Sequence, residues 1–128
     1  MQNNLHDAVG VLEVLPAVRR TATANGSAVD IQQYVGKLKF ILASSAGGGT
    51  SPTMDVKLQD SADGSTGWAD ISGAAFTQVT DGADTTAALG LVANSVKRYV
   101  RAVATIGGTS PTFDCAVVAV GTQQVRGA

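Results

Sequence analysis

The chain has 128 residues, the length of a single domain, and a domain of this size can bury a hydrophobic core without disulfides or metals. Nine basic and ten acidic residues give a formal net charge of −1, so the charge balance does not indicate a nucleic-acid-binding protein. Charged residues make up only 15% of the chain, while 20 alanines and 15 glycines supply small side chains. A surface of this kind suits close packing against other protein subunits.

The N-terminal residues have the features of neither a secretory signal nor a membrane span. They lack a cationic start, and the apolar run over 8–15 is interrupted by Glu13 and stopped by Pro16. No stretch of the sequence approaches the roughly 20 apolar residues that cross a bilayer. We therefore expect a soluble protein that is made in the cytoplasm.

Residues 1–15 are predicted to form an N-terminal arm or a first strand. Val9 and Val11 would lie on one face and Leu12 and Val14 on the other, so a strand here needs cover on both sides.

The segment Ala17–Ala24 is predicted to form a further strand, ended by the tight-turn signal Asn25-Gly26. A short strand over 29–31 then leads to Tyr34, which we expect at the edge of the sandwich.

The hexapeptide GGTSPT occurs twice, at 48–53 and at 107–112, an offset of 107 − 48 = 59 residues. The hexapeptides join four alternating segments: 38–44 and 54–60 around the first, 99–106 and 113–120 around the second. We interpret each hexapeptide as the tip of a hairpin. Two equivalent hairpins can bury their inner faces against each other in a sandwich.

The strands that follow the two hexapeptides differ on one face. In the first, apolar residues alternate with polar residues that include Lys57 and Gln59, as in a half-buried strand. In the second they alternate with Ala116, Val118 and Val120, so both faces are apolar. Such a strand either lies in mid-sheet under a covering segment or meets another subunit.

Between the two copies, Asp60–Gly67 and Asp81–Asp84 are predicted turns around two short strands, 68–71 and 75–79. The segment 85–92 fits either a strand or a short helix, and its glycine and β-branched ends favour the strand.

The pattern as a whole predicts an all-β chain, an antiparallel and jelly-roll-like β-sandwich of eight to ten short strands with an extended N-terminal arm. Residues 16–122 would form the sandwich and residues 123–128 a polar tail.

No group of residues has the pattern of a catalytic site, so the chain is not expected to be an enzyme. The only histidine, His6, lies close to the N-terminus, which leaves no credible Ser/His/Asp set. The glycine-rich segment 47–53 lacks the Gly-Lys-Ser/Thr ending and the following helix of a phosphate loop. We predict no catalytic residue, no cofactor and no metal site.

Three side chains invite closer scrutiny. Asp60 and Asp63 lie in a turn with the composition of a calcium loop, but the distal glutamate and flanking helices of an EF-hand are missing. An aspartate that caps the turn's own N–H groups is the favoured interpretation, and weak calcium binding is the alternative. Cys115, the only cysteine, cannot form an internal disulfide and is expected to be buried.

The predicted partner interface combines apolar residues of the N-terminal segment, a pair of arginines and the outward face of the last strand. Its members are Leu5, Val9, Val11, Leu12, Arg19, Arg20, Ala116, Val118 and Val120. The arginines fit either solvated strand ends or salt bridges to an acidic partner surface.

Three segments of the chain resemble a group of small virion proteins encoded in the head gene clusters of tailed bacteriophages, the capsid decoration or cement proteins. These segments are VDIQQYVGKLKFILASSAG, VKLQDSADGSTGWADISGAAFTQVT and VKRYVRAVATIGGTSPTFDCAVVAVG, within residues 28–122. The resemblance implies a β-sandwich on the capsid exterior of the virion, bound to the major capsid protein, often as a homotrimer. It implies no active site, nucleic acid or membrane, and an N-terminal segment, here Asn4–Leu15, that reaches neighbouring shell subunits.

The leading hypothesis is a structural virion protein that bridges major capsid subunits through many weak contacts. One alternative is a carbohydrate- or host-surface-binding sandwich of a phage tail or appendage, which needs exposed aromatics around a shallow site. The chain supplies one Trp and two Tyr for such a site. Another alternative is a different head–tail structural subunit.

Overall fold

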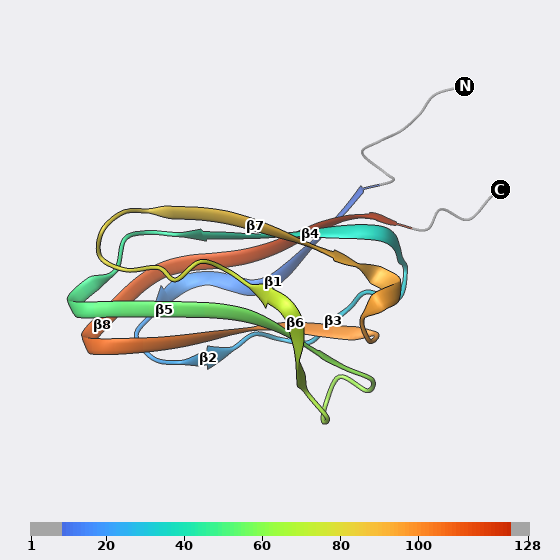
Figure 1. Cartoon of the computed structure of the whole chain (residues 1–128), viewed down its shortest axis with the longest axis horizontal. Helices are drawn as coiled ribbons and strands as arrows, with labels where there is room; N and C mark the ends of the chain where they lie inside the picture. Colours follow the sequence, from blue (N-terminus) through green and yellow to red (C-terminus); the bar gives the residue numbers. More distant parts are fainter. Residues whose placement is uncertain (1–8, 124–128) are drawn as a thin grey trace, which may run out of the picture.

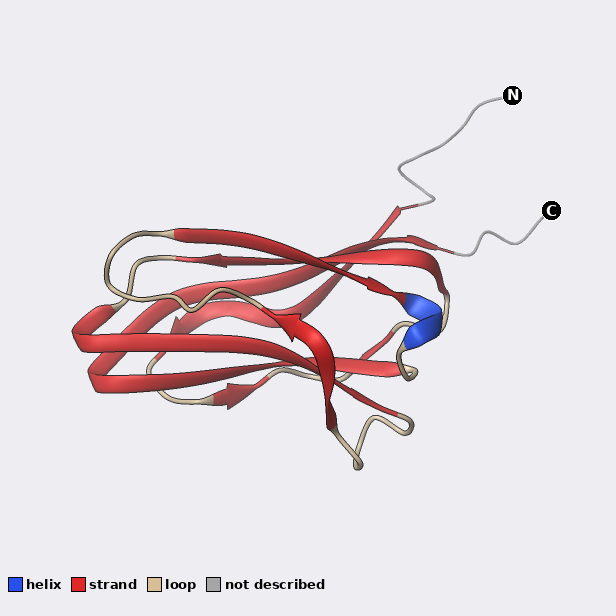
Figure 2. Ribbon diagram, in the orientation of Figure 1, coloured by secondary structure: helices blue, strands red, loops and turns tan. Residues whose placement is uncertain are grey.

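The computed structural model describes residues 9–123, which form eight β-strands and one turn of 3-10 helix (Figures 1 and 2). The elements are β1 (Val9–Arg20), β2 (Ala24–Asn25), β3 (Val29–Asp30), β4 (Tyr34–Ser44), β5 (Gly48–Ser61), β6 (Ala69–Ala75), β7 (Thr85–Val92), η1 (Ala93–Ser95) and β8 (Tyr99–Gln123).

The strands form two antiparallel sheets that share the long strand β8. Sheet 1 has the order β1, C-terminal half of β8, β4, β7. Sheet 2 has the order β6, β5, N-terminal half of β8, with the short strands β2 and β3 along its far side. Figure 1 shows the two layers one above the other, which confirms the predicted antiparallel β-sandwich.

The core lies between the layers, where each long strand sends every second side chain. β4 contributes Leu38, Phe40 and Leu42, all fully buried, and β5 contributes the predicted inner set Met54, Val56 and Leu58. The two halves of β8 add further fully buried side chains: Val100, Ala102, Ala104, Phe113 and Val117. The period of two in the sequence therefore corresponds to burial on one face of each strand.

The two GGTSPT hexapeptides are not hairpin tips, which corrects the interpretation from the sequence. They pair with each other, because Gly48 lies opposite Thr112 and Thr53 lies opposite Gly107. Segment 34–61 therefore runs antiparallel to segment 99–123 along its whole length. Both segments bend at their hexapeptide and pass from one sheet to the other, so the paired hexapeptides form a corner of the sandwich.

The backbone at this corner explains why each chain segment bends there and does not reverse. Gly49 and Gly108 have φ values of +96° and +109°, and Ser51 and Ser110 both have φ of 49°. Left-handed residues at alternate positions kink a strand without folding it back on itself. The same two positions are used in each copy, so the corner is close to two-fold symmetric.

Several predicted boundaries need correction. β1 runs without interruption from Val9 through Pro16 to Arg20, so there is no separate strand over Ala17–Ala24, and the strand crosses the boundary drawn between residues 15 and 16. The chain has eight strands among its described residues, as expected, but β8 alone has 25 residues and is not short. The jelly-roll connectivity stays a prediction.

The segments between the two copies largely follow the sequence pattern. Thr85–Val92 is a strand, as favoured over a helix. β6 is one strand that continues through Gly73 to Ala75. Beyond it, Phe76 and Val79 of the expected strand 75–79 form backbone hydrogen bonds with β5. Tyr34 is buried at the start of β4. The arm over residues 1–8 and the tail beyond residue 123 lie outside the described residues.

Candidate docking surface

The outward face of sheet 1 carries an apolar surface over four neighbouring strands. Its central row is formed by Val118 on β8, with Glu13 of β1 on one side and Ile41 of β4 on the other, followed by Ala88 of β7. We call the apolar members of this surface the docking face: Val11, Ile41, Ala43, Ala88, Ala116, Val118 and Val120.

The side chains of the docking face point away from the core. In β8, Cys115, Val117 and Ala119 are at most 5% exposed and face the core. The residues that alternate with them, Ala116, Val118 and Val120, must therefore lie on the outward side. Val11 is 67% exposed, an unusual value for a large aliphatic side chain within a strand. The last strand does lie in mid-sheet, as one alternative required, but no segment of the described chain covers its outward face.

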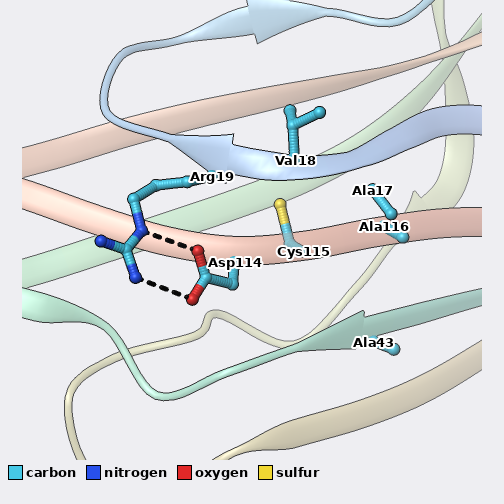
Figure 3. Close-up of a pocket in the computed structure, with 7 residues that line it drawn as sticks. All are labelled: Ala17, Val18, Arg19, Ala43, Asp114, Cys115 and Ala116. Atoms are coloured by element: carbon cyan, nitrogen blue, oxygen red, sulfur yellow. Dashed lines mark hydrogen bonds and ion pairs between the residues drawn. The ribbon is translucent and has the colours of Figure 1, made fainter.

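At one end the docking face is hollowed into a shallow depression of about 450 Å³ (Figure 3). It lies where β1 shifts register against β8, and its lining combines small side chains with one ion pair: Ala17, Val18, Arg19, Ala43, Asp114, Cys115 and Ala116. The alanines leave room for an incoming side chain, while the bulge of β1 opens the sheet edge.

The rim of this depression carries one ion pair, Arg19 with Asp114, whose charges cancel. Arg19 donates two hydrogen bonds to Asp114, from Nε at 2.8 Å and from Nη2 at 3.1 Å. The guanidinium group holds the pKa of Asp114 below its usual value, and the carboxylate raises the pKa of Arg19. Both side chains are more than half exposed, so this pair adds little stability and orients two polar groups at the edge of an apolar patch.

The structure brings most of the predicted interface residues onto the docking face or its margin. Val9 and Val11 share the outward face of β1 with Arg19, beside Ala116, Val118 and Val120 on β8. Two residues go elsewhere and one lies outside the described residues, Leu5.

Leu12 and Arg20 are the residues that leave the predicted interface. Leu12 lies opposite the fully buried Ala119 and packs against the core. Arg20 lies opposite the buried Phe113 and donates a hydrogen bond from Nη2 to the carbonyl oxygen of Pro16. Their neighbours in the sequence point outward, so alternation assigns these two to the inner side.

Sequence reasoning missed three members of the docking face. Ile41 and Ala43 alternate with the buried residues of β4, so the period of two already placed them outward. Ala88 was hidden because the period of residues 85–92 did not separate a strand from a helix. What the sequence could not supply was the pairing of β4 with both β7 and β8, which joins these side chains into one surface.

The outward face of sheet 2 is polar, and its groups bond to one another. Gln59 donates to Asp70 at 2.8 Å and accepts two hydrogen bonds from Arg101, while Lys57 forms an ion pair with Asp70 at 3.1 Å. The Arg101 guanidinium also lies 4.4 Å from the centre of the Trp68 ring. These groups satisfy each other, so this face has little need of a partner.

The loop suspected of binding calcium is organised by its own backbone. Asp63 accepts hydrogen bonds from the N–H groups of Ser65 and Thr66 and from the Thr66 hydroxyl, and these bonds lower the pKa of its carboxyl. Asp60 accepts a hydrogen bond from the N–H of Lys97. Within residues 9–123 no three metal-ligating side chains gather at one place.

Cys115 is buried as predicted, with 5% of its surface exposed, and burial raises the pKa of its thiol. In the part of the chain that the structure describes, no helix has the length and apolar character required to cross a bilayer.

Comparison with known proteins supports the fold. No protein-family model and no curated protein matches the chain. A solved structure from Bacillus endospore appendages, described as a family of disulfide-linked pili, is similar with a TM-score of 0.51. The similarity covers 92% of this chain and 90% of that chain at 15% sequence identity, so it concerns the all-β fold alone.

Proposed function

We propose that this protein is a non-enzymatic structural subunit that binds a larger protein assembly through the docking face of sheet 1. The observation that carries the proposal is the docking face, whose apolar side chains come from four neighbouring strands and include the exposed residues Val11, Ala43 and Ala88. Exposed apolar patches of this kind are characteristic of protein–protein contact. Small side chains let another surface approach closely, and the Arg19–Asp114 pair supplies orientation at its edge.

The assembly we propose is a bacteriophage capsid, which the chain would decorate from outside by bridging major capsid subunits. The sequence segments that resemble decoration proteins include β4, the end of β5 and most of β8, and β4 and β8 carry five of the seven members of the docking face. A trimer on the capsid exterior is part of what that resemblance implies. Many copies, each with a modest apolar contact, would together strengthen a shell.

Co-sedimentation with undecorated phage shells assembled from major capsid protein tests this proposal. Val118→Lys puts a charge at the centre of the docking face without touching the core, so binding to shells should weaken by about 10- to 100-fold. Thr105→Lys adds the same charge on the exposed outward face of sheet 2 and should leave binding unchanged. Equal binding by the two variants, or none by the native protein, would rule out this surface as the shell contact.

A second candidate function is a subunit of a self-assembling filament. The similarity of fold to a protein of disulfide-linked pili favours it. The disulfide itself has no counterpart here, because the only cysteine, Cys115, is buried. Electron microscopy of the purified protein separates the candidates, since a filament subunit forms polymers without any shell.

A further inference from the structure

The four sheet edges of this sandwich are protected very unequally. An edge strand exposes unpaired backbone N–H and C=O groups, and proteins usually block such edges with proline, charge, bulges or short strands. β1, at one edge of sheet 1, contains Pro16 and two register shifts against β8. β2 and β3, on one side of sheet 2, have two residues each.

The remaining edge of sheet 2 is blocked as well. β6 carries the charged Asp70 and a glycine in the left-handed region, Gly73 with φ of +75°, and its pairing with β5 shifts register. Beyond β6, β5 is covered by backbone hydrogen bonds to Phe76 and Val79. Three of the four edges therefore resist the addition of another strand.

β7, the other edge of sheet 1, has none of these protections. Its eight residues, Thr85–Val92, include no proline and no charged side chain. Each of them pairs with β4 in an unbroken register, from Lys37 opposite Val92 to Ser44 opposite Thr85. Within the described chain no backbone hydrogen bond joins β7 to anything but β4, and Figure 2 shows it as the outermost strand of its layer.

Side chains along β7 are also incompletely covered. Ala87 and Leu89 point inward but are only half-buried. A shallow depression of about 370 Å³ runs beside them, lined by Lys37, Leu38, Lys39, Ala88, Leu89 and Gly90. An added strand would bury Leu89 and satisfy the free half of the β7 backbone groups together.

We infer that β7 pairs with β7 of a second copy of this chain, antiparallel and about a two-fold axis, so that sheet 1 continues from one subunit into the next. We take the added strand to come from a second copy of this chain, because that copy has the same single unprotected edge, its own β7. Two-fold pairing is self-complementary, since each strand meets its own equivalent.

Charge and geometry are compatible with this pairing. An uncharged β7 places no like charges opposite each other, and Lys39 of each subunit lies on β4, one strand further in. The two Lys39 residues would be three strand spacings apart, about 14 Å, which exceeds the screening length of about 8–10 Å. With the axis at Ala88 or Leu89, outward residues meet outward residues, so the two docking faces form one continuous surface.

This inference does not rest on the capsid proposal, and it sets a dimer of the free protein against the homotrimer that the resemblance implies. Self-association of the purified protein tests it. Light scattering and sedimentation should give the mass of a dimer. Thr86→Lys with Ala88→Lys puts like charges on exposed positions beside the axis and should raise the dissociation constant about tenfold or more. Thr86→Glu with Ala88→Glu should do the same, and an equimolar mixture of the two variants should recover the dimer.

The control adds two charges away from this edge. Thr77→Lys with Thr105→Lys uses two exposed positions outside sheet 1 and should keep the dimer. Val118→Lys should weaken shell binding and keep the dimer, so the two proposals can fail independently. Unchanged thermal unfolding of every variant confirms that it is folded.

Hydrogen exchange provides a second measurement that needs no variant. Alternate amides of residues 85–92 should become protected as protein concentration rises, because alternate N–H groups point away from β4. A monomer at all concentrations, a trimer, a dimer indifferent to both double variants, or a mixture that fails to re-form the dimer would each overturn the inference.

Discussion

The two copies of the repeat, residues 38–61 and 97–120, share their inner face and differ on their outer face. With the offset of 59 residues, Met54, Val56 and Leu58 correspond to Phe113, Cys115 and Val117, and all six are at most 5% exposed. The outward residues Lys57 and Gln59 correspond instead to Ala116 and Val118.

The inner positions agree because both copies line one core, whereas the outer positions meet different surroundings. Gln59 lies within a polar network on sheet 2, while Val118 lies on the bare docking face of sheet 1. The repeat therefore specifies the corner and the core, whereas the apolar outer face of the second copy lies outside the core cluster and is a separate feature.

Equivalent core positions should be comparably costly to truncate, and this is the largest effect we expect. Phe113→Ala should lower the free energy of unfolding by about 3–5 kcal/mol and Met54→Ala by about 2–5 kcal/mol, because each leaves a cavity. Urea unfolding followed by circular dichroism measures both. Val118→Ala, on the docking face, serves as the control and should cost less than about 1 kcal/mol.

The corner offers the next test, because its two glycines should be equally intolerant of a side chain. A Cβ on Gly49 would collide with the carbonyl oxygens of Thr109 and Ser110, and one on Gly108 with that of Ser51. With the positive φ at both sites, Gly49→Ala and Gly108→Ala should each cost about 1–3 kcal/mol or more in urea unfolding.

Gly90 is the matched control for the corner. Its Cβ would lie 3.8 Å from the carbonyl oxygen of Leu38, an ordinary contact, so Gly90→Ala should be tolerated within about 0.5 kcal/mol. A corner variant as stable as this control would show that the two hexapeptides do not depend on their left-handed glycines.

Exchanging the outer residues tests whether the two faces have different tasks. Gln59→Val removes hydrogen bonds to Asp70 and Arg101 and should cost about 0.5–1.5 kcal/mol in urea unfolding. Val118→Gln should change stability by less than about 1 kcal/mol, because Val118 lies outside the hydrophobic core cluster. The opposite ranking in stability would mean that the docking face supports the fold.

Much of the fold could be predicted because burial leaves a period of two in the sequence. The inner sets of β4, β5 and β8 were readable residue by residue, and so was the outward row of Ala116, Val118 and Val120. The pairing partner of each strand could not be predicted in the same way. Strands that follow one another in the sequence usually pair, so a hairpin was the natural interpretation of GGTSPT.

The corner depends on a conformation that side-chain patterning does not encode. Serine at positive φ is uncommon, so the kinks at Ser51 and Ser110 could not be inferred from composition. The docking face is likewise assembled by long-range pairing, since Val11 and Val120 are neighbours only because β1 lies against β8. Local pattern therefore predicted the members of the face without predicting its extent.

The smallest effect concerns loop 62–67, which follows the first copy and has no equivalent after the second. The Asp63 carboxylate in this loop accepts hydrogen bonds from N–H groups of the turn. These bonds lower the pKa of the carboxyl in the folded protein below the unfolded value of about 4. Because the folded protein binds this proton less tightly than the unfolded chain does, the ionised carboxylate stabilises the folded state above about pH 4. That stabilisation is lost as the pH falls and the carboxyl is protonated.

Asp63→Asn should therefore lower the melting temperature by a roughly constant amount from pH 5 to pH 8, and the difference from the native protein should shrink below about pH 4. Differential scanning calorimetry at a series of pH values measures this. Asp81→Asn, which removes a carboxylate from another exposed turn, is the control and should change the melting temperature less than Asp63→Asn does at neutral pH. If Asp63→Asn instead left the melting temperature unchanged at every pH, the loop would be held by the shape of the residue, which asparagine keeps, and the charge would contribute little.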